Sequence, residues 1–206
     1  MRLTKYTHAC VRLEKDGKRL VIDPGVWTEL EALDEADAIL VTHEHFDHLN
    51  AELLATLTAP VWTNAGVAAQ LGILGDQVTV VSAGQAFEAA GFSVRVFGED
   101  HAVILPEIGV PCRNTAFLVD DAVYHPGDSW TRPDRAVHTN LVPLSAPWHV
   151  MAEAVEYVRE VPAEQTVNIH DGLLNERGMT IGKNWIGGQG GKPYVELAPR
   201  DAIDVG

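Results

Sequence analysis

The first part of the chain alternates between apolar runs and polar or turn-forming residues. Residues 9–13 and 19–23 are rich in apolar side chains, and the Asp16-Gly17 pair between them favours a tight turn, so this part predicts a β-hairpin. Residues 38–41 read Ala-Ile-Leu-Val, a short continuous apolar run typical of a buried strand. Polar residues begin where these runs stop, so we expect polar side chains at the ends of the predicted strands.

Helical spacing marks two later segments. Residues 49–57 carry leucines at helical spacing and are followed by Pro60, which predicts a helix that ends before the proline. Residues 151–160 have the pattern of an amphipathic helix. The other predicted elements are a short helix within 27–37, strands at 61–63 and 78–81, a short helix at 65–71, a hairpin at 86–97, and strands at 116–119, 122–125, 141–144 and 165–169.

The tail contains a glycine-rich stretch, Gly187 to Gly191. It lacks the Gly-Lys-Ser/Thr ending of a phosphate-binding loop. We interpret it as a mobile turn, and a role in gating a nearby site stays open.

Composition indicates one globular domain. The chain has 206 residues, of which 46% are hydrophobic and 21% charged, and no linker or low-complexity segment divides it. We therefore expect a single domain over residues 1–206. No apolar run approaches the length of a membrane span, and residues 1–8 lack the charged head and apolar core of a signal peptide. These features predict a cytoplasmic protein with no membrane partner.

Charge and cysteine content exclude further classes. The formal net charge is −14, whereas nucleic-acid binding draws on clustered Lys and Arg, so we expect a small-molecule substrate and no nucleic-acid partner. Cys10 and Cys112 lie far apart and outside any C-x-x-C pattern, so neither a disulfide framework nor a thiolate zinc site is predicted. The oligomeric state stays open.

Directly after the apolar run, residues 42–48 read Thr-His-Glu-His-Phe-Asp-His, an H-x-H-x-D-H pattern. Imidazole nitrogens and carboxylate oxygens suit zinc and neighbouring divalent metals, and the short spacing lets one loop aim several of them at one point. The competing interpretation is a solvated polar loop. It is the weaker one, because clustered histidines repel one another when protonated.

Three more polar residues follow predicted strands: His101, Asp128 and His170. Each has an ordinary interpretation by itself, since a lone histidine is usually a polar core or surface residue and Asp128 follows the turn-forming pair Pro126-Gly127. Their order and separation behind the motif favour a shared site.

This order of residues resembles the metallo-β-lactamase superfamily, in which H-x-H-x-D-H is followed by an isolated His, a Gly-Asp pair and a final His. The opening, with His8 in residues 7–9 and Ile-Asp-Pro-Gly at 22–25, is similar to the branch that contains the ascorbate-6-phosphate lactonase. The resemblance implies an α/β fold, a four-layer αββα sandwich with the metals at one sheet edge.

The resemblance also implies the ligands of two divalent metal ions. His43, His45 and His101 would hold the first ion, Asp47, His48 and His170 would hold the second, and Asp128 would bridge both. Zinc is expected, with manganese and iron also open, because all donors are hard or borderline. Asp47 and Asp128 are the expected catalytic residues, with Asp47 orienting the attacking hydroxide.

The expected function is hydrolysis of a small-molecule ester, lactone or related bond by a metal-bound hydroxide. A nuclease or phosphodiesterase of the same fold is the first alternative, and the acidic charge disfavours it. An oxygen- or sulfur-oxidising iron enzyme and a non-catalytic metal-binding protein are the others. None of the implied ligands is missing, which disfavours the last of these.

Several neighbouring residues have open roles. Asp23 is either a carboxylate that orients a metal-bound imidazole or a turn residue. His8 is assigned to the site rather than to packing in the first strand. His125 is either an acid or substrate contact or a strand residue that faces away, and His149 is a candidate for the pocket lining. His138 looks ordinary. Asp100 and Asp171 adjoin proposed ligands and either orient neighbouring groups or, as the favoured interpretation, are solvated turn residues.

Overall fold

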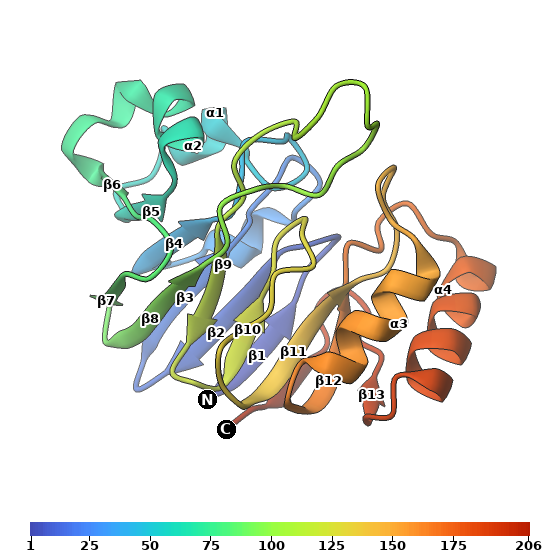
Figure 1. Cartoon of the computed structure of the whole chain (residues 1–206). Coiled ribbons are helices and arrows are strands. Elements are labelled where there is room, and N and C mark those ends of the chain that lie inside the picture. Colours follow the sequence, from blue (N-terminus) through green and yellow to red (C-terminus); the bar gives the residue numbers. More distant parts are fainter.

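The computed structural model describes residues 1–206 and contains two seven-stranded sheets that face each other (Figure 1). The first sheet has the order β14-β1-β2-β3-β4-β5-β6 and the second β13-β12-β11-β10-β9-β8-β7. The strands are β1 (Arg2–Lys5), β2 (Val11–Lys15), β3 (Lys18–Ile22), β4 (Ala38–Val41), β5 (Val61–Thr63), β6 (Val78–Val80), β7 (Ala86–Ala89), β8 (Phe92–Phe97), β9 (Ala116–Val119), β10 (Val123–His125), β11 (Val137–Pro143), β12 (Ala163–Ile169), β13 (Tyr194–Val195) and β14 (Ala202–Asp204). The helices are α1 (Ala51–Leu54), α2 (Ala65–Gln70), α3 (Met151–Glu160) and α4 (Glu176–Gly182), with 3-10 segments η1 (Leu30–Leu33) and η2 (Gly72–Gln77) and a π-helical turn η3 (Lys183–Gly187).

Both sheets follow the same plan. In the first, β1, β2 and β3 pair antiparallel, and β3, β4, β5 and β6 then pair in parallel. In the second, β8, β9 and β10 pair antiparallel, and β10, β11, β12 and β13 pair in parallel. As a result β3, β4 and β5 end at one edge of their sheet, and β8, β10 and β12 end at one edge of the other.

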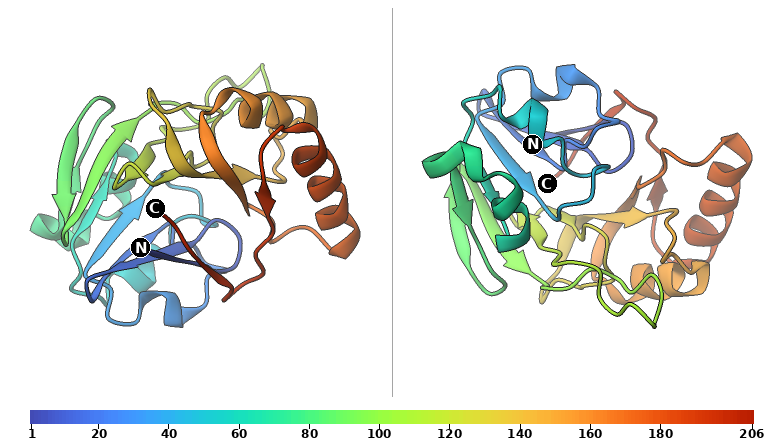
Figure 2. Two further views of the ribbon diagram at one scale, coloured as in Figure 1. Left: turned by 90° about the horizontal axis from the view of Figure 1, so that it is seen from below. Right: turned by 90° about the horizontal axis from the view of Figure 1, so that it is seen from above.

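Alternating apolar residues hold the two sheets together. Leu13 and Leu20 from the first sheet and Phe117 and Leu141 from the second belong to one buried cluster of 21 residues, because side chains two apart on a strand point to the same face. Burying each large side chain contributes about 1.5–3 kcal/mol. Figure 2 shows the two sheets stacked, with the chain termini close together where β1 pairs with β14.

Helices cover both outer faces. Leu54 of α1 and Val67 of α2 pack in a second cluster against the outer face of the first sheet. Val158 of α3 and Ile186 of η3 pack in a third cluster with strand residues of the second sheet. The four-layer αββα sandwich is therefore confirmed. None of the helices is both long and apolar enough to cross a membrane.

Most predicted elements are present, although β1, α4, β13 and β14 were not predicted, and two predicted segments differ from the structure. The helix predicted over 49–57 covers only Ala51–Leu54, because Asn50 caps it with a hydrogen bond from the Leu53 N–H and residues after Leu54 turn towards Pro60. The mobile turn predicted at 187–191 is wrong for its first part, where helical backbone continues to Gln189. The Gly190 N–H then donates to the Ile186 carbonyl at 2.8 Å, and Gly190 packs on Val158, so this stretch lies against α3.

Two glycines let the connections approach each other at the strand ends. A Cβ on Gly25 would lie 2.0 Å from the Asp47 carbonyl oxygen. Gly127 has φ +61°, and a Cβ there would lie 2.2 Å from Asn114 Oδ1, which accepts a hydrogen bond from the Asp128 N–H at 2.9 Å. Both glycines therefore lie against segments that carry the polar residues singled out in the sequence.

We predict that Gly25→Ala lowers the free energy of unfolding by about 2 kcal/mol or more, because the added methyl group displaces the backbone of residues 47–48. The measurement is urea unfolding followed by circular dichroism. Gly72→Ala is the matched control, since nothing lies within 4 Å of a Cβ there. Equal unfolding midpoints for the two variants would contradict this account of Gly25.

Candidate metal centre

The structure brings the predicted polar residues together at the strand ends. Residues 42–48 follow β4, and His101, Asp128 and His170 follow β8, β10 and β12. The Thr42 carbonyl accepts hydrogen bonds from the Thr115 N–H at 2.8 Å and from Asn64 Nδ2 at 2.9 Å, which ties the loop after β4 to both sheets. The site therefore spans the two sheets.

One group of potential ligands consists of His43, His45, His101 and Asp128, whose donor atoms all lie within 4.8 Å of one another. His43 Nε2 is 3.1 Å from His45 Nδ1. Asp128 Oδ2 is 3.4 Å from His101 Nε2 and 3.9 Å from His43 Nε2. Three imidazole nitrogens and one carboxylate oxygen thus face a common point.

A second group consists of His8, Asp47, His48 and His170, again within 4.8 Å of one another. The other Asp128 oxygen, Oδ1, lies 3.0 Å from His48 Nε2 and 3.2 Å from His170 Nε2. Asp47 Oδ2 is 3.6 Å from His170 Nε2. One buried carboxylate therefore presents one oxygen to each group.

The outer nitrogens of these rings are already hydrogen-bonded. His48 Nδ1 lies 2.6 Å from Asp23 Oδ2, His101 Nδ1 lies 2.6 Å from the Ala102 carbonyl, and His170 Nδ1 contacts the Ser145 carbonyl. These oxygens can only accept, so each neutral ring carries its proton on Nδ1. The inner Nε2 atoms of all three rings, and Asp128 Oδ1, are buried without a hydrogen-bond partner.

This pattern leaves bare imidazole lone pairs facing a carboxylate. Such an arrangement is unfavourable in a buried site unless a cation, either a proton or a metal ion, lies between the groups. Metal-binding histidines have the same two-sided arrangement, with one nitrogen bare and the other donating to a carbonyl or carboxylate. The residues present therefore fit divalent metal ions.

Charge coupling keeps the carboxylates ionised. Burial raises the pKa of Asp128, but His48 and His170 outweigh burial and hold that pKa well below its usual range. Burial also raises the pKa of Asp47, but the hydrogen bond with His8 and the nearby His48 lower it to about 2. Both carboxylates are therefore anionic near neutral pH.

The imidazoles divide into two kinds. Burial, reinforced by His48, lowers the pKa of His43 well below its usual range. Burial alone would lower the pKa of His48 as well, but Asp128 and Asp23 outweigh it and raise that pKa well above its usual range. Asp128 and Asp23, which lie on either side of His48, therefore favour positive charge at this ring.

Asp23 anchors the loop that carries the motif. It is fully buried with φ 53°, and its carboxylate accepts hydrogen bonds from the Thr42 N–H and the Thr42 hydroxyl, both at 2.7 Å, in addition to its contact with His48. The Thr42 hydroxyl in turn lies 3.0 Å from His43 Nδ1. Asp23 thus has both roles that the sequence left open, because it follows a strand and orients an imidazole.

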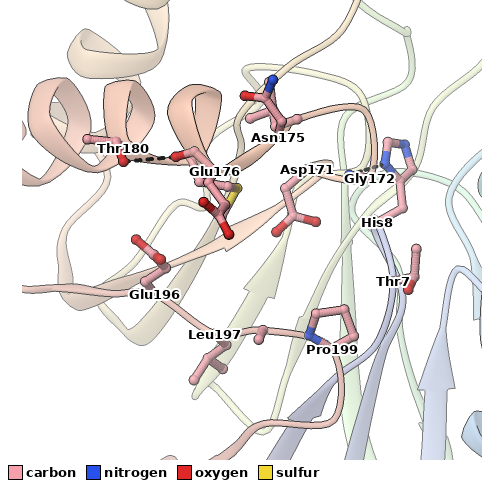
Figure 3. A pocket seen from close by; sticks show the side chains of 13 residues that line it. Thr7, His8, Asp171, Gly172, Asn175, Glu176, Thr180, Glu196, Leu197 and Pro199 are labelled. Atoms are coloured by element: carbon pink, nitrogen blue, oxygen red, sulfur yellow. Dashed lines mark hydrogen bonds between the residues drawn. The ribbon is translucent and has the colours of Figure 1, made fainter.

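His8 lies at the site but has a different role from the other histidines. Its backbone has φ 68°, its side chain is buried, and its Nδ1 accepts a hydrogen bond from the Gly172 N–H at 3.1 Å (Figure 3). The proton of the neutral ring is therefore on Nε2, which donates to Asp47 Oδ2 at 3.0 Å. This geometry makes His8 an orienting partner of Asp47 rather than a bare donor.

Two other sequence expectations do not match the structure. His125 is fully buried and lies outside both donor groups: its Nε2 donates to the Ala9 carbonyl at 2.9 Å and its Nδ1 accepts from the Gly127 N–H at 3.1 Å, so it supports the turn before Asp128. Asp171 is a buried residue, not a solvated turn residue, because the fully buried Lys5 Nζ lies 2.9 Å from its Oδ1.

Asp100 is exposed and pairs with Arg113 at 2.8 Å, as expected for a solvated residue. His138, half-buried at the start of β11, hydrogen-bonds the Thr139 hydroxyl at 2.8 Å and lies outside both groups.

Sequence reasoning missed two contacts. Trp148 Nε1 donates to Asp128 Oδ2 at 3.0 Å, and the Cys112 Sγ lies 3.9 Å from His45 Nε2. Burial raises the pKa of Cys112 to about 12, so it remains a thiol. The only sequence signal for Trp148 was its position next to His149, a candidate for the pocket lining.

Two cavities flank the cluster. One, of about 550 Å³, borders His8; Figure 3 shows Asp171, Glu176 and Glu196 around it. The other, of about 730 Å³, lies on the Trp148 side and includes His149 in its lining. The two cavities thus differ in the residues that line them.

Comparisons with known proteins agree with this geometry. Residues 2–170 match the family model described as the β-lactamase superfamily domain. Protein Rv0786c of Mycobacterium tuberculosis is 35% identical over 89% of this chain and 91% of its own length. A protein of Methanosphaerula palustris named UPF0173 metal-dependent hydrolase is 35% identical over 63% of this chain and 61% of its own length.

The fold is shared with solved structures as well. Igni18, described as a metallo hydrolase from Ignicoccus hospitalis, superimposes with a TM-score of 0.75 at 19% identity, covering 98% of this chain and 97% of its own. The similarity to the lactonase branch stays a prediction. The chain itself belongs to the β-lactamase superfamily, as its order of histidines and aspartates predicted.

Proposed function

We propose that this protein is a metal-dependent hydrolase with two divalent metal ions at the cluster around Asp128. The observation that carries the proposal is the set of buried Nε2 atoms of His48, His101 and His170 that have no partner and face this carboxylate. Relatives named metal-dependent hydrolases support the same reaction class.

The two groups of donors suggest how the ions are shared. The first ion would be held by His43, His45 and His101, the second by Asp47, His48 and His170, and Asp128 would contribute one oxygen to each. Zinc is the proposed metal, because imidazole nitrogens and carboxylate oxygens are its usual donors, and manganese and iron are the alternatives that the same donors accept.

The surrounding residues support hydrolysis. When bound, such ions supply an activated water and neutralise negative charge that develops on the substrate. Asp128 is buried, whereas the side chain of Asp47 is 15% exposed, so Asp47 is the carboxylate that an attacking water reaches. His8 holds Asp47 Oδ2, which leaves the other oxygen to orient that water.

A small uncharged ester or lactone is the proposed substrate. Neither cavity beside the centre has a lysine or arginine in its lining, so neither offers the cationic contacts that a phosphodiester backbone requires. The net charge of −14 further disfavours a nucleic acid. The proposed location is the cytoplasm.

We predict that His101→Ala removes at least one metal equivalent per chain and lowers kcat/KM for p-nitrophenyl acetate by more than about 100-fold. Removing even a group that orients a ligand typically costs 10–100-fold, and a ligand is needed more directly. Metal content by mass spectrometry and ester hydrolysis measure the two effects. His138→Ala, outside both groups, is the matched control and should keep both; full metal content in His101→Ala would contradict the assignment.

For His8, we predict that His8→Leu weakens metal binding about 10–100-fold without lowering the number of ions bound at saturation, because Asp47 loses its orienting N–H. His8→Gln retains an N–H donor and should bind metal more tightly than His8→Leu. Chelator competition measures both. If each variant lost one full metal equivalent, His8 would be a ligand instead.

The reaction class is tested with the zinc-loaded protein on two chromogenic substrates. We expect hydrolysis of p-nitrophenyl acetate with kcat/KM at least about 10-fold above that for bis(p-nitrophenyl) phosphate, since no cationic residue lines the cavities. A preference for the phosphodiester would support the nuclease alternative.

A further inference from the structure

The larger cavity, on the Trp148 side, is built from segments that continue directly from proposed metal ligands. Ala102 follows His101, Ser129 follows Asp128, and both residues line the cavity. Trp148, a third part of the lining, donates its indole N–H to Asp128 Oδ2 at 3.0 Å. A molecule in this cavity therefore lies next to the centre.

Six of the 13 residues that line this cavity are hydrophobic, among them two tryptophans and two valines. Trp130 and Trp148 pack edge to face with their ring centroids 5.0 Å apart. Val103 and Val150, from opposite segments of the lining, are 46% and 49% exposed. Covering such exposed apolar side chains with a ligand lowers the free energy, because their surface is removed from water.

The charged groups of the lining disfavour an anionic occupant. Asp100 pairs with Arg113, which is not itself part of the lining, and Glu153 accepts a hydrogen bond from Trp130 Nε1 at 3.0 Å. No lysine or arginine lines the cavity. A carboxylate or phosphate would find no counter-charge there, whereas an uncharged hydrocarbon group would cover the tryptophans and valines.

The two cavities also differ from each other. The cavity on the His8 side has three carboxylates in its lining, Asp171, Glu176 and Glu196, whereas the Trp148 side has two tryptophans (Figure 3). The volume of about 730 Å³ on the Trp148 side is in the range of small-molecule sites. The tryptophans and valines on the Trp148 side thus offer an apolar substituent a place beside the centre.

We infer that the cavity lined by Val103, Trp130, Trp148 and Val150 is a substrate subsite for an uncharged aliphatic or aromatic group attached to the scissile bond. This inference rests on the proposed hydrolase function and narrows its substrate class. It predicts that affinity for the reacting molecule rises with the length of that group.

The first test compares p-nitrophenyl acetate, butyrate and hexanoate with the zinc-loaded protein. Burial of each added methylene should raise kcat/KM by about threefold. Val103→Asn should flatten this chain-length dependence. Val80→Asn is the matched control, because Val80 is 51% exposed on β6 and does not line this cavity, so the wild-type slope should persist.

The second test needs no catalysis. Titration of 1-hexanol into the nitrogen-15-labelled protein should shift the indole N–H signals of Trp130 and Trp148, and Val103→Asn should weaken that response. The indole signal of Trp62, which lies on β5 and stacks on Phe87 of β7, should stay in place. Assignment of the indole signals by single Trp→Phe variants makes this reading unambiguous.

The two tests separate the subsite from the reaction. Ester hydrolysis with no chain-length dependence and no shift of Trp130 or Trp148 would overturn the subsite while the hydrolase stands. Shifts confined to the exposed Trp185 would also overturn it. Shifts of Trp130 and Trp148 that Val103→Asn weakens, in a protein that hydrolyses no ester, would support the apolar subsite and overturn the hydrolase.

Discussion

The carboxylate of Asp128 sets the constraint around which the site is organised. Its two oxygens lie between imidazole rings of both donor groups, and it is buried. Bare nitrogens and a carboxylate at 3.0–3.4 Å repel one another unless cations separate them. The outer hydrogen bonds of His48, His101 and His170 hold the rings in this orientation. The orientation costs free energy in the folded protein, and a bound metal ion offsets that cost.

The fold meets this constraint by bringing the ends of strands from two sheets to one place. The motif follows β4 in the first sheet, and His101, Asp128 and His170 follow strands of the second. The core between the sheets fixes their separation, while Gly25 and Gly127 allow the connecting segments to touch without side chains between them. The packing of the sandwich therefore sets the positions of the segments that carry the donors.

Much of this arrangement follows from the sequence. The apolar run at β4 predicted a buried strand, and the H-x-H-x-D-H spacing behind it predicted clustered donors, because both are local patterns. The αββα fold came from the order of His101, Asp128 and His170 along the chain through its resemblance to a known superfamily. That superfamily membership is confirmed, whereas the ligand roles stay predictions.

Other features depend on contacts between distant segments and have no local signal. Lys5 is buried against Asp171, 166 residues away, and nothing around either residue predicts the pair. The tautomer of His8 is set by the Gly172 N–H, and the glycines at 187–188 continue a helix because α3 packs against that segment. The direction in which His125 faces could not be read either, since a strand has two faces.

The most direct test of the central claim is a crystal structure of the zinc-loaded protein with anomalous data at the zinc edge. The account predicts two peaks about 3.5–4 Å apart on either side of Asp128, one beside His43, His45 and His101 and the other beside Asp47, His48 and His170. A fully loaded protein with no peak next to Asp128, or with one ion that Asp128 does not contact, would contradict it.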